Sequence, residues 1–224
     1  MRDCLLMLGG DAPAGLALKL INALRGDELL VIAADHGADH CRALGLPIDL
    51  LIGDLDSIEP ATAAAAAAAA ATSRLPQDKD LTDGEAALLA AIAARPRRLF
   101  ICGAEGGRPD HALGNLLLLF TPGLPPHTAL YGAGSIVYPV RDKLQLWAEP
   151  GDTFSLLPFG ACHGVCERGC KWELIDAELP PHSSRGLSNI ALGPVEISLR
   201  EGCLLAIHQT YTLPPAIQET EMSL

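Results

Sequence analysis

The sequence predicts an α/β protein of two domains: an N-terminal three-layer domain built on a parallel sheet, residues 1–141, followed by a small antiparallel β-sandwich, residues 142–224. Two observations predict this organisation. Short, continuous apolar runs alternate with helical stretches in the first part, as in a parallel sheet that is buried on both faces. In the second part the apolar segments follow one another without helices, and glycines and prolines separate them, as in antiparallel β structure.

The elements of the first domain follow from the position of these runs. Four runs have the length of a strand: Cys4–Leu8, Leu29–Ala34, Leu50–Ile52 and Leu99–Cys102. Four stretches are expected to be helices: Gly15–Leu24, Pro60–Ala71, Thr82–Ala94 and His111–Phe120. The third helix has the clearest start, because Thr82 and Glu85 form a capping box.

The second domain is expected to contain short antiparallel strands, because each of its apolar segments is bounded by glycine or proline. The segments are Lys143–Trp147, Thr153–Leu157, Gly164–Glu167, Lys171–Leu174, Glu196–Arg200 and Cys203–His208. Their rhythm favours two packed sheets over a second α/β unit.

Composition argues against two classes of protein. The chain has 27 acidic and 16 basic residues, a formal net charge of −11, and no stripe of lysine or arginine, so nucleic-acid binding is not expected. The first apolar run ends at Gly9-Gly10, too early for a signal peptide, and no lipophilic run reaches the ~20 residues of a membrane span. Without an export signal, the seven cysteines are expected to be reduced thiols in a cytoplasmic protein that does not bind membranes.

Acidic residues gather where the expected strands of the first domain end. Asp35 follows the second strand, and Asp54 and Asp56 follow the third. Three more surround the start of the third helix: Asp78, Asp80 and Asp83. The carboxyl ends of parallel strands meet at one edge of a sheet, so these acids are expected to converge there. Converging carboxylates need a cation, and Mg²⁺ suits oxygen ligands of this kind.

A glycine-rich loop follows the fourth strand and supplies a positive group. Its glycines, from Gly103 to Gly107, allow backbone amides to approach a ligand, and Arg108 offers a guanidinium fork to a phosphate. The helix that begins near Asp110 turns its N-terminus toward the same edge, which favours an anion. A magnesium site, a phosphate clamp and a helix N-terminus together predict phosphoryl transfer. The chain has no G-x-x-x-x-G-K-[ST] sequence, so it is not a P-loop enzyme.

The motifs around these residues resemble those of the thiamine pyrophosphokinase family over nearly the whole chain. Three lie in the first domain: G-D-L-D-S-I at Gly53–Ile58, D-K-D-L-T-D at Asp78–Asp83, and G-G-R-P-D-H at Gly106–His111 with Asn115 four residues on. Three follow in the second, in the family's order: Phe154–Pro158, Gly169–Trp172 and Leu187–Asn189. Each motif alone is a weak signal, but six in sequence are a strong one.

The resemblance implies an enzyme that transfers diphosphate from ATP to the hydroxyl of thiamine with Mg²⁺ and releases AMP. It also implies a homodimer with active sites formed between subunits. The implied metal-site acids are Asp54, Asp56, Asp80 and Asp83, and the implied catalytic residues are Asp54, Asp56, Asp83 and Arg108. The implied ATP-binding residues are Asp35, Asp78, Thr82, Arg108, Asp110, His111 and Asn115. The implied thiamine-binding residues are Trp172, Ser188 and Asn189.

Two segments depart from the family pattern. The motif A-D-G-G-A-N reads A-D-H-G-A-D here, so His36 replaces a glycine and Asp39 replaces an asparagine. Tyr131–Ser135 lacks the acidic and amide residues that the family usually has there, which leaves the adenine contacts unassigned.

Other interpretations stay open at this point. A haloacid-dehalogenase-like phosphatase would use Asp54 as nucleophile and Asp56 as general acid, but it leaves the two later motifs of the first domain unexplained. A non-catalytic thiamine- or nucleotide-binding module is the other alternative. Plain structural roles remain possible for Asp78 at a helix start, for Trp172 in a core and for Ser188-Asn189 in a turn. The spacing of Cys162, Cys166 and Cys170 does not fit a zinc site, and a metal at His36 and His40 is not expected either.

Overall fold

The computed structural model describes residues 2–25, 28–53, 58–59, 61–62, 71–74 and 80–217. The chain divides into two compact units, residues 1–132 and 133–224. Strand β7 (Ser135–Val140), which lies before the boundary that the sequence predicts at residue 141, pairs with a strand of the second unit.

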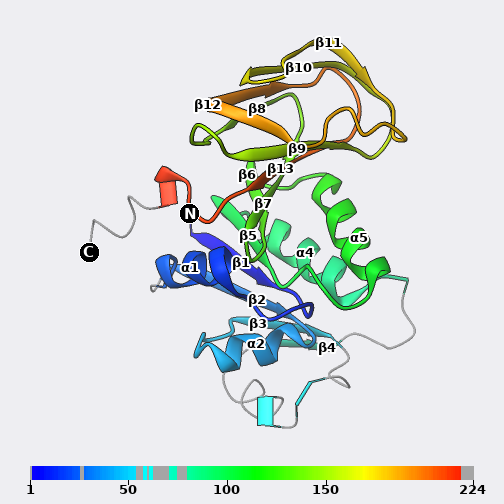
Figure 1. The fold of residues 1–224 in the computed structure, drawn as a ribbon. Helices are drawn as coiled ribbons and strands as arrows, with labels where there is room; N and C mark the ends of the chain where they lie inside the picture. The colour runs from blue at the N-terminus through cyan, green and yellow to red at the C-terminus, as the bar shows by residue number, and fades with distance from the viewer. Residues whose placement is uncertain are drawn as a thin grey trace. The chain divides into compact units, whose positions relative to one another are not determined.

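The first unit is built on a parallel sheet (Figure 1). Its described strands are β1 (Asp3–Met7), β2 (Leu29–Ala34), β3 (Leu50–Gly53), β4 (Ala71–Arg74), β5 (Arg98–Cys102) and β6 (His127–Tyr131). Neighbouring strands follow the order β6-β5-β1-β2-β3-β4, and every pair is parallel. The chain thus moves outward from β1 to β4, returns to β5 on the other side of β1, and continues to β6. In sheets of this topology, ligands bind at the point where the order reverses.

Helices connect these strands. Those with described bounds are α1 (Gly15–Ala23), α2 (Gly37–Ala43), α4 (Asp83–Ala93) and α5 (Pro109–Leu117), the last followed by the 3-10 turn η1 (Leu118–Phe120). Right-handed crossovers in this strand order put α1 and α2 on one face of the sheet and α4 and α5 on the opposite face. Figure 1 draws the two pairs on either side of the strands. Burial on both faces explains why β1 is apolar without alternation, with Cys4, Leu5, Leu6 and Met7 fully buried.

The expectation of an α/β domain is confirmed. The elements that the sequence predicts to within two residues are β1, β2, β3, β5, α1 and α4, whereas β4, β6 and α2 are not predicted. The helix expected over Pro60–Ala71 is wrong at its last residue, because Ala71 begins β4, which pairs with β3. Positions 60 and 63–70 lie outside the described residues. Tertiary pairing overrides the helix propensity of alanine at this point.

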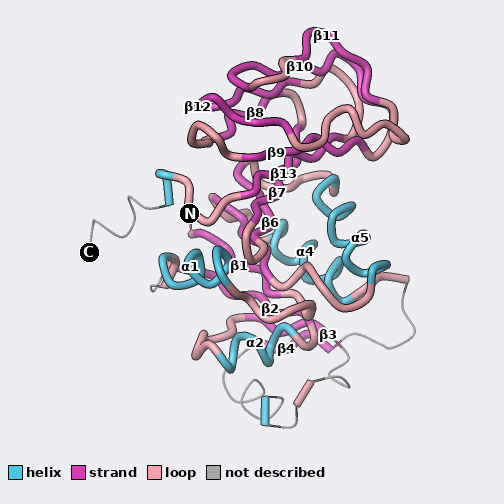
Figure 2. The backbone as a smooth tube through the Cα atoms, viewed as in Figure 1, coloured by secondary structure: helices cyan, strands magenta, loops and turns pink. Residues whose placement is uncertain are grey.

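The second unit consists mainly of antiparallel strands (Figure 2). Besides β7 they are β8 (Lys143–Leu146), β9 (Thr153–Pro158), β10 (Cys162–Cys170), β11 (Leu174–Leu179), β12 (Asn189–Ser198) and β13 (Leu204–Gln209). β13 lies between β7 and β9, and β10 lies between β11 and β12. β12 belongs to both groups, because its first two residues pair with β9 and later residues of the strand pair with β8 and β10.

One core joins the two groups of strands. Phe154 and Leu156 of β9 belong to the same buried cluster as Val165 of β10 and Ile197 of β12. Burial alternates along β9, as expected for an antiparallel strand with one face toward a core. The strand expected over Lys171–Leu174 is wrong, because positions 171–173 form a turn and β11 begins at Leu174. Within the described part of the chain, no helix has the length and apolar character needed to span a membrane.

Candidate functional site

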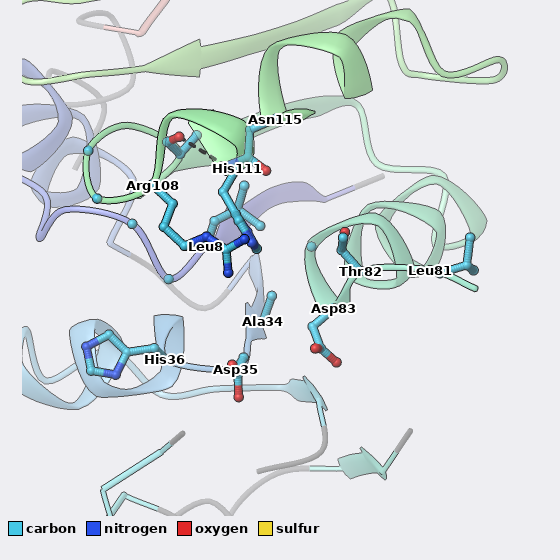
Figure 3. Close-up of a pocket in the computed structure, with 16 residues that line it drawn as sticks. Leu8, Ala34, Asp35, His36, Leu81, Thr82, Asp83, Arg108, His111 and Asn115 are labelled. Carbon is cyan, nitrogen blue, oxygen red and sulfur yellow. Dashed lines mark hydrogen bonds between the residues drawn. The ribbon is translucent and has the colours of Figure 1, made fainter. Parts of the chain in front are cut away.

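A pocket of about 500 Å³ lies at the carboxyl ends of β1, β2 and β5, where the strand order reverses (Figure 3). Residues at the start of α4 and in α5 also line it. Its lining comprises Leu8, Gly9, Gly10, Ala34, Asp35, His36, Leu81, Thr82, Asp83, Gly84, Ala104, Gly106, Gly107, Arg108, His111 and Asn115.

The loops after β1 and β5 are joined by backbone hydrogen bonds. The N–H of Gly10 donates to the carbonyl of Gly103 at 2.7 Å, and the N–H of Asp11 donates to the carbonyl of Glu105 at 2.7 Å. A Cβ on Gly10 would lie 2.2 Å from the Glu105 carbonyl oxygen, so a side chain cannot fit there. Backbone, not side chains, therefore lines this wall of the pocket. The sequence predicts the second loop but not the first, whose only signal is the Gly9-Gly10 pair directly after a strand.

Two described acids line the pocket, Asp35 from the end of β2 and Asp83 from the start of α4. Asp35 has a left-handed backbone (φ 47), which aspartate tolerates better than most residues, and its N–H donates to Ile52 at 2.9 Å. A Cβ on Gly53 would lie 3.3 Å from the Asp35 Cα, so β3 ends in tight contact with β2. Asp54, Asp56 and Asp78 lie outside the described residues.

The start of α4 forms as the capping box predicts. The N–H of Glu85 donates to the Thr82 hydroxyl at 3.1 Å, which makes Thr82 the N-cap. Thr82 and Asp83 both line the pocket, whereas Asp80 is exposed and is not among the lining residues. The N-terminus of this helix thus contributes a hydroxyl, a carboxylate and its partial positive charge.

Arg108 reaches the pocket from the loop after β5, where it is the N-cap residue of α5. Its guanidinium forms a fork with Asp110, with Nε 3.2 Å from Oδ1 and Nη2 2.6 Å from Oδ2. This hydrogen bond raises the pKa of Arg108 and lowers the pKa of Asp110. Asn115 donates to the Ala104 carbonyl at 3.0 Å and so ties α5 to the loop, and His111 also lines the pocket.

The two substituted positions after β2 have different environments. His36 has a right-handed helical backbone (φ −55), so this position does not require glycine. Its Nδ1 lies 2.8 Å from Oδ2 of Asp39. Asp39 is buried and also accepts hydrogen bonds from the Thr62 hydroxyl and the Glu59 N–H. Asp39 is therefore not an additional pocket acid but an anchor for the segment after β3.

The expected thiamine residues lie in the second unit and differ in exposure. Trp172 is 54% exposed, so it is not a core aromatic, and Lys171 Nζ lies 4.5 Å from the centre of its ring. Ser188 is exposed, with a left-handed backbone, and its N–H donates to the Ser155 hydroxyl at 3.0 Å. Asn189 is only 5% exposed, and its amide bonds to backbone groups of Trp172 and Ile190.

The cysteines of β10 serve packing. Cys162 and Cys170 belong to the buried core, and burial raises the pKa of the Cys170 thiol to about 11. Cys166 accepts a hydrogen bond from the Asp176 N–H at 3.3 Å. Among the described residues, no group of three or more His, Cys, Asp or Glu side chains is arranged to hold a metal ion, at β10 or beside His36 and His40.

Comparison with protein families gives two matches. Residues 22–130 match the family model "Thiamin pyrophosphokinase, catalytic domain", and residues 142–204 match "Thiamin pyrophosphokinase, vitamin B1 binding domain". The two matches together span most of the chain. Among curated proteins, a sequence comparison finds no match.

Solved structures give the same picture of the fold. The thiamine pyrophosphokinase of Bacillus subtilis has a TM-score of 0.79 and 24% identity, over 93% of this chain and 99% of that one. A thiamin pyrophosphokinase family protein of Enterococcus faecalis has a TM-score of 0.80 and 23% identity, over 94% and 99%. The thiamin pyrophosphokinase of Candida albicans has a TM-score of 0.77 at 13% identity, over 93% and 89%.

Proposed function

This chain belongs to the thiamin pyrophosphokinase family and is a thiamine diphosphokinase, and on that premise we propose that the pocket of its first unit binds ATP. The observation that carries the proposal is the convergence of Asp35, Thr82, Asp83 and Arg108 on one pocket of about 500 Å³ where the strand order reverses. Pockets of this size hold small-molecule ligands, and this position is the usual one for nucleotides in doubly wound sheets.

The phosphates of ATP would lie against the glycine loops and the start of α5. The loops present backbone rather than side chains, and the helix N-terminus favours an anion. The exposed guanidinium of Arg108, which contacts Asp110, presents the fork geometry that a phosphate also accepts. A phosphate oxygen pair therefore competes with the Asp110 carboxylate for Arg108. When the phosphate replaces Asp110, the guanidinium of Arg108 would contact the phosphate group that is transferred.

Magnesium is the cofactor that fits the acids of this pocket. Asp35 and Asp83 offer two carboxylates in one cavity, and Mg²⁺ binds one or two protein carboxylates together with phosphate oxygens and water. We include Asp54 and Asp56 as ligands on the motif alone, since they lie outside the described residues. The bound ion would neutralise negative charge on the diphosphate as it is transferred.

In the reaction, the hydroxyl of thiamine attacks the β-phosphorus of ATP and AMP departs. The chain's own residues act by position and charge: Arg108 holds a phosphate, and Thr82 and Asp83 orient the ligand at the start of α4. Asn115 acts indirectly, because its hydrogen bond to Ala104 fixes the loop that carries Arg108.

Thiamine would contact the second unit through its exposed residues. The indole face of Trp172 suits the cationic thiazolium ring of thiamine. Lys171 already lies over this ring, so the substrate cation would either displace the lysine or take the opposite face. Ser188 is exposed next to the buried Asn189 and is the second proposed contact.

We also propose a homodimer and a cytoplasmic location. In α5 no side chain is fully buried, and Leu113 and Leu117 are 56% and 50% exposed, which supports a partner surface along this helix. All seven cysteines are free thiols, as a reducing compartment maintains them.

A paired substitution tests the pocket. Asp83→Asn is expected to lower kcat at least ~100-fold in an assay of AMP and thiamine diphosphate, because it removes a charged group from the metal site. The matched control is Glu85→Gln, an acid two residues later in the first turn of the same helix that does not line the pocket, and it should change kcat less than about 3-fold. Equal losses in both variants would contradict the assignment. Release of inorganic phosphate in place of AMP would favour the phosphatase alternative.

A further inference from the structure

A single side chain holds both backbone polar groups of Trp172. Oδ1 of Asn189 accepts the Trp172 N–H at 3.1 Å, and Nδ2 of Asn189 donates to the Trp172 carbonyl at 2.8 Å. The same Oδ1 accepts the N–H of Ile190 at 2.9 Å, and the N–H of Lys171 donates to the Ile190 carbonyl at 2.9 Å. The start of β12 therefore fixes the turn that carries the exposed indole.

The orientation of this amide has to be specified, because an asparagine side chain can rotate and exchange its oxygen and nitrogen. If it rotated here, an NH₂ group would face the N–H of Trp172 and an oxygen would face its carbonyl. Nδ2 has a second hydrogen, which points to two acceptors on β10. Cys170 Sγ lies 3.3 Å away and Glu167 Oε2 lies 3.5 Å away.

Glu167 is an unusual residue for this position. It is 1% exposed, and its second oxygen, Oε1, makes no hydrogen bond to any described residue. Burial raises the pKa of its carboxyl to about 7, and the hydrogen bond from Asn189 and the charge of Arg185 offset this only in part. A buried acid is costly where a leucine or valine would pack freely, so a role for the carboxyl is expected.

We propose that Glu167 is a positioning residue of the thiamine subsite, where its carboxyl fixes the Asn189 amide in the orientation that holds Trp172. The inference rests on the proposed contact between Trp172 and thiamine. Glu167 does not touch substrate in this account. It acts through Asn189, and the result is an indole whose direction is set before the substrate arrives. Such preorganisation increases affinity, because less conformational freedom is lost on binding.

The test uses tryptophan fluorescence together with steady-state kinetics on the full-length enzyme. The chain has two tryptophans, so a Trp147→Phe background makes Trp172 the sole emitter. Glu167→Met removes the carboxylate acceptor and fills its place with an apolar side chain of similar length. Glu167→Gln keeps an acceptor and serves as the conservative rescue. The matched control is Thr210→Val, which removes a buried hydrogen-bonding hydroxyl elsewhere in the second unit.

Glu167→Met is expected to shift the emission of Trp172 without any ligand and to raise the KM for thiamine roughly 3- to 10-fold, the effect of losing one hydrogen bond. The KM for Mg-ATP and kcat should change less than about 2-fold, because only the thiamine subsite is affected. Glu167→Gln and Thr210→Val should match the background enzyme. Asn189→Asp replaces the amide donor by a carboxylate next to Glu167. It should shift the Trp172 emission and raise the KM for thiamine more than Glu167→Met does.

The outcomes separate this inference from the proposed function. If Trp172→Ala raises the KM for thiamine while Glu167→Met changes neither emission nor KM, the positioning role is wrong and the subsite stands. If Trp172→Ala leaves the KM for thiamine unchanged, the subsite itself is wrong. Equal effects of Glu167→Met and Thr210→Val would show general destabilisation of the unit and would overturn the inference as well.

Discussion

Replacing Glu167 by glutamine should make the stability of the second unit less dependent on pH. In the unfolded chain this carboxyl ionises near its ordinary pKa of 4.5, whereas in the folded protein burial raises the pKa to about 7. Between these values the folded state holds a proton that the unfolded state has lost. The free energy of unfolding therefore falls as pH rises from 4.5 to 7, and the loss persists above 7. A glutamine cannot ionise, so the free energy of unfolding of the variant lacks this decrease with rising pH.

The magnitude follows from the shift. The difference between 7 and 4.5 is 2.5 pKa units. At 1.36 kcal/mol per unit, Glu167→Gln should be more stable than the wild type by about 3 kcal/mol at pH 8, and the advantage should vanish near pH 4.5. The side chain is almost fully buried, so solvent does not screen this charge as it would at the surface.

Urea denaturation at pH 5, 6, 7 and 8 measures the difference. Both tryptophans, Trp147 and Trp172, lie in the second unit, so their fluorescence reports the unfolding of this unit. Other titrating groups are shared by the two proteins and cancel in the comparison. Glu196→Gln is the matched control, because the Glu196 side chain is 39% exposed and its hydrogen bond to Lys143 lowers its pKa. Relative to the wild type, Glu196→Gln should not gain stability as pH rises. If the difference in free energy of unfolding between Glu167→Gln and the wild type stays constant from pH 5 to 8, the reasoning is refuted.

Three further outcomes are expected. Gly10→Ala should abolish activity, because a Cβ there would lie 2.2 Å from the backbone carbonyl oxygen of Glu105, whereas Gly114→Ala, at a helical position with open space around it, should retain most of it; activity assays compare the two, and equal activities would contradict the steric argument. Trp172→Ala should raise the KM for thiamine roughly 5- to 30-fold with little change for Mg-ATP, since one cation–π contact is lost; equal weakening of both substrates would refute this. Metal analysis of the purified protein should find no stoichiometric zinc, and one zinc per chain would overturn the packing role of the β10 cysteines.

Four of the parallel strands, β1, β2, β3 and β5, were predictable because burial on both faces leaves no polar position in the middle of the strand. The other two, β4 (A-T-S-R) and β6 (H-T-A-L-Y), contain polar residues and were not predicted. β1 and β2 are apolar along nearly their whole length, so no competing periodicity confuses the pattern. The sequence did not predict α2, a helix of only seven residues, G-A-D-H-C-R-A, without a side-chain cap on its first turn. It predicted a strand at Lys171–Leu174, where the contacts of Asn189 impose a turn instead. That contact joins residues 17 apart, which local propensity cannot reveal.

The site was predictable in part for the same reason. Topology alone implies that residues following β2 and β5 meet, so Asp35 and Arg108 were expected in one pocket. The contribution of Gly9 and Gly10 depends on backbone contacts with the loop after β5. These contacts cannot be predicted from the residue types alone. The burial of Asn189 likewise appears only in three dimensions. It changes the role that we propose for this residue from ligand contact to support of Trp172.

The position of β13 has a consequence for how the protein is made. This strand pairs with β7 on one side and with β9 on the other, although it follows both in the chain by tens of residues. On the ribosome, β7 and β9 therefore emerge with unpaired edges that wait for residues 204–209. A premature stop before Leu204 would not trim the border of the second unit but would remove a strand from its middle. Such a truncated product should aggregate rather than persist as a smaller enzyme.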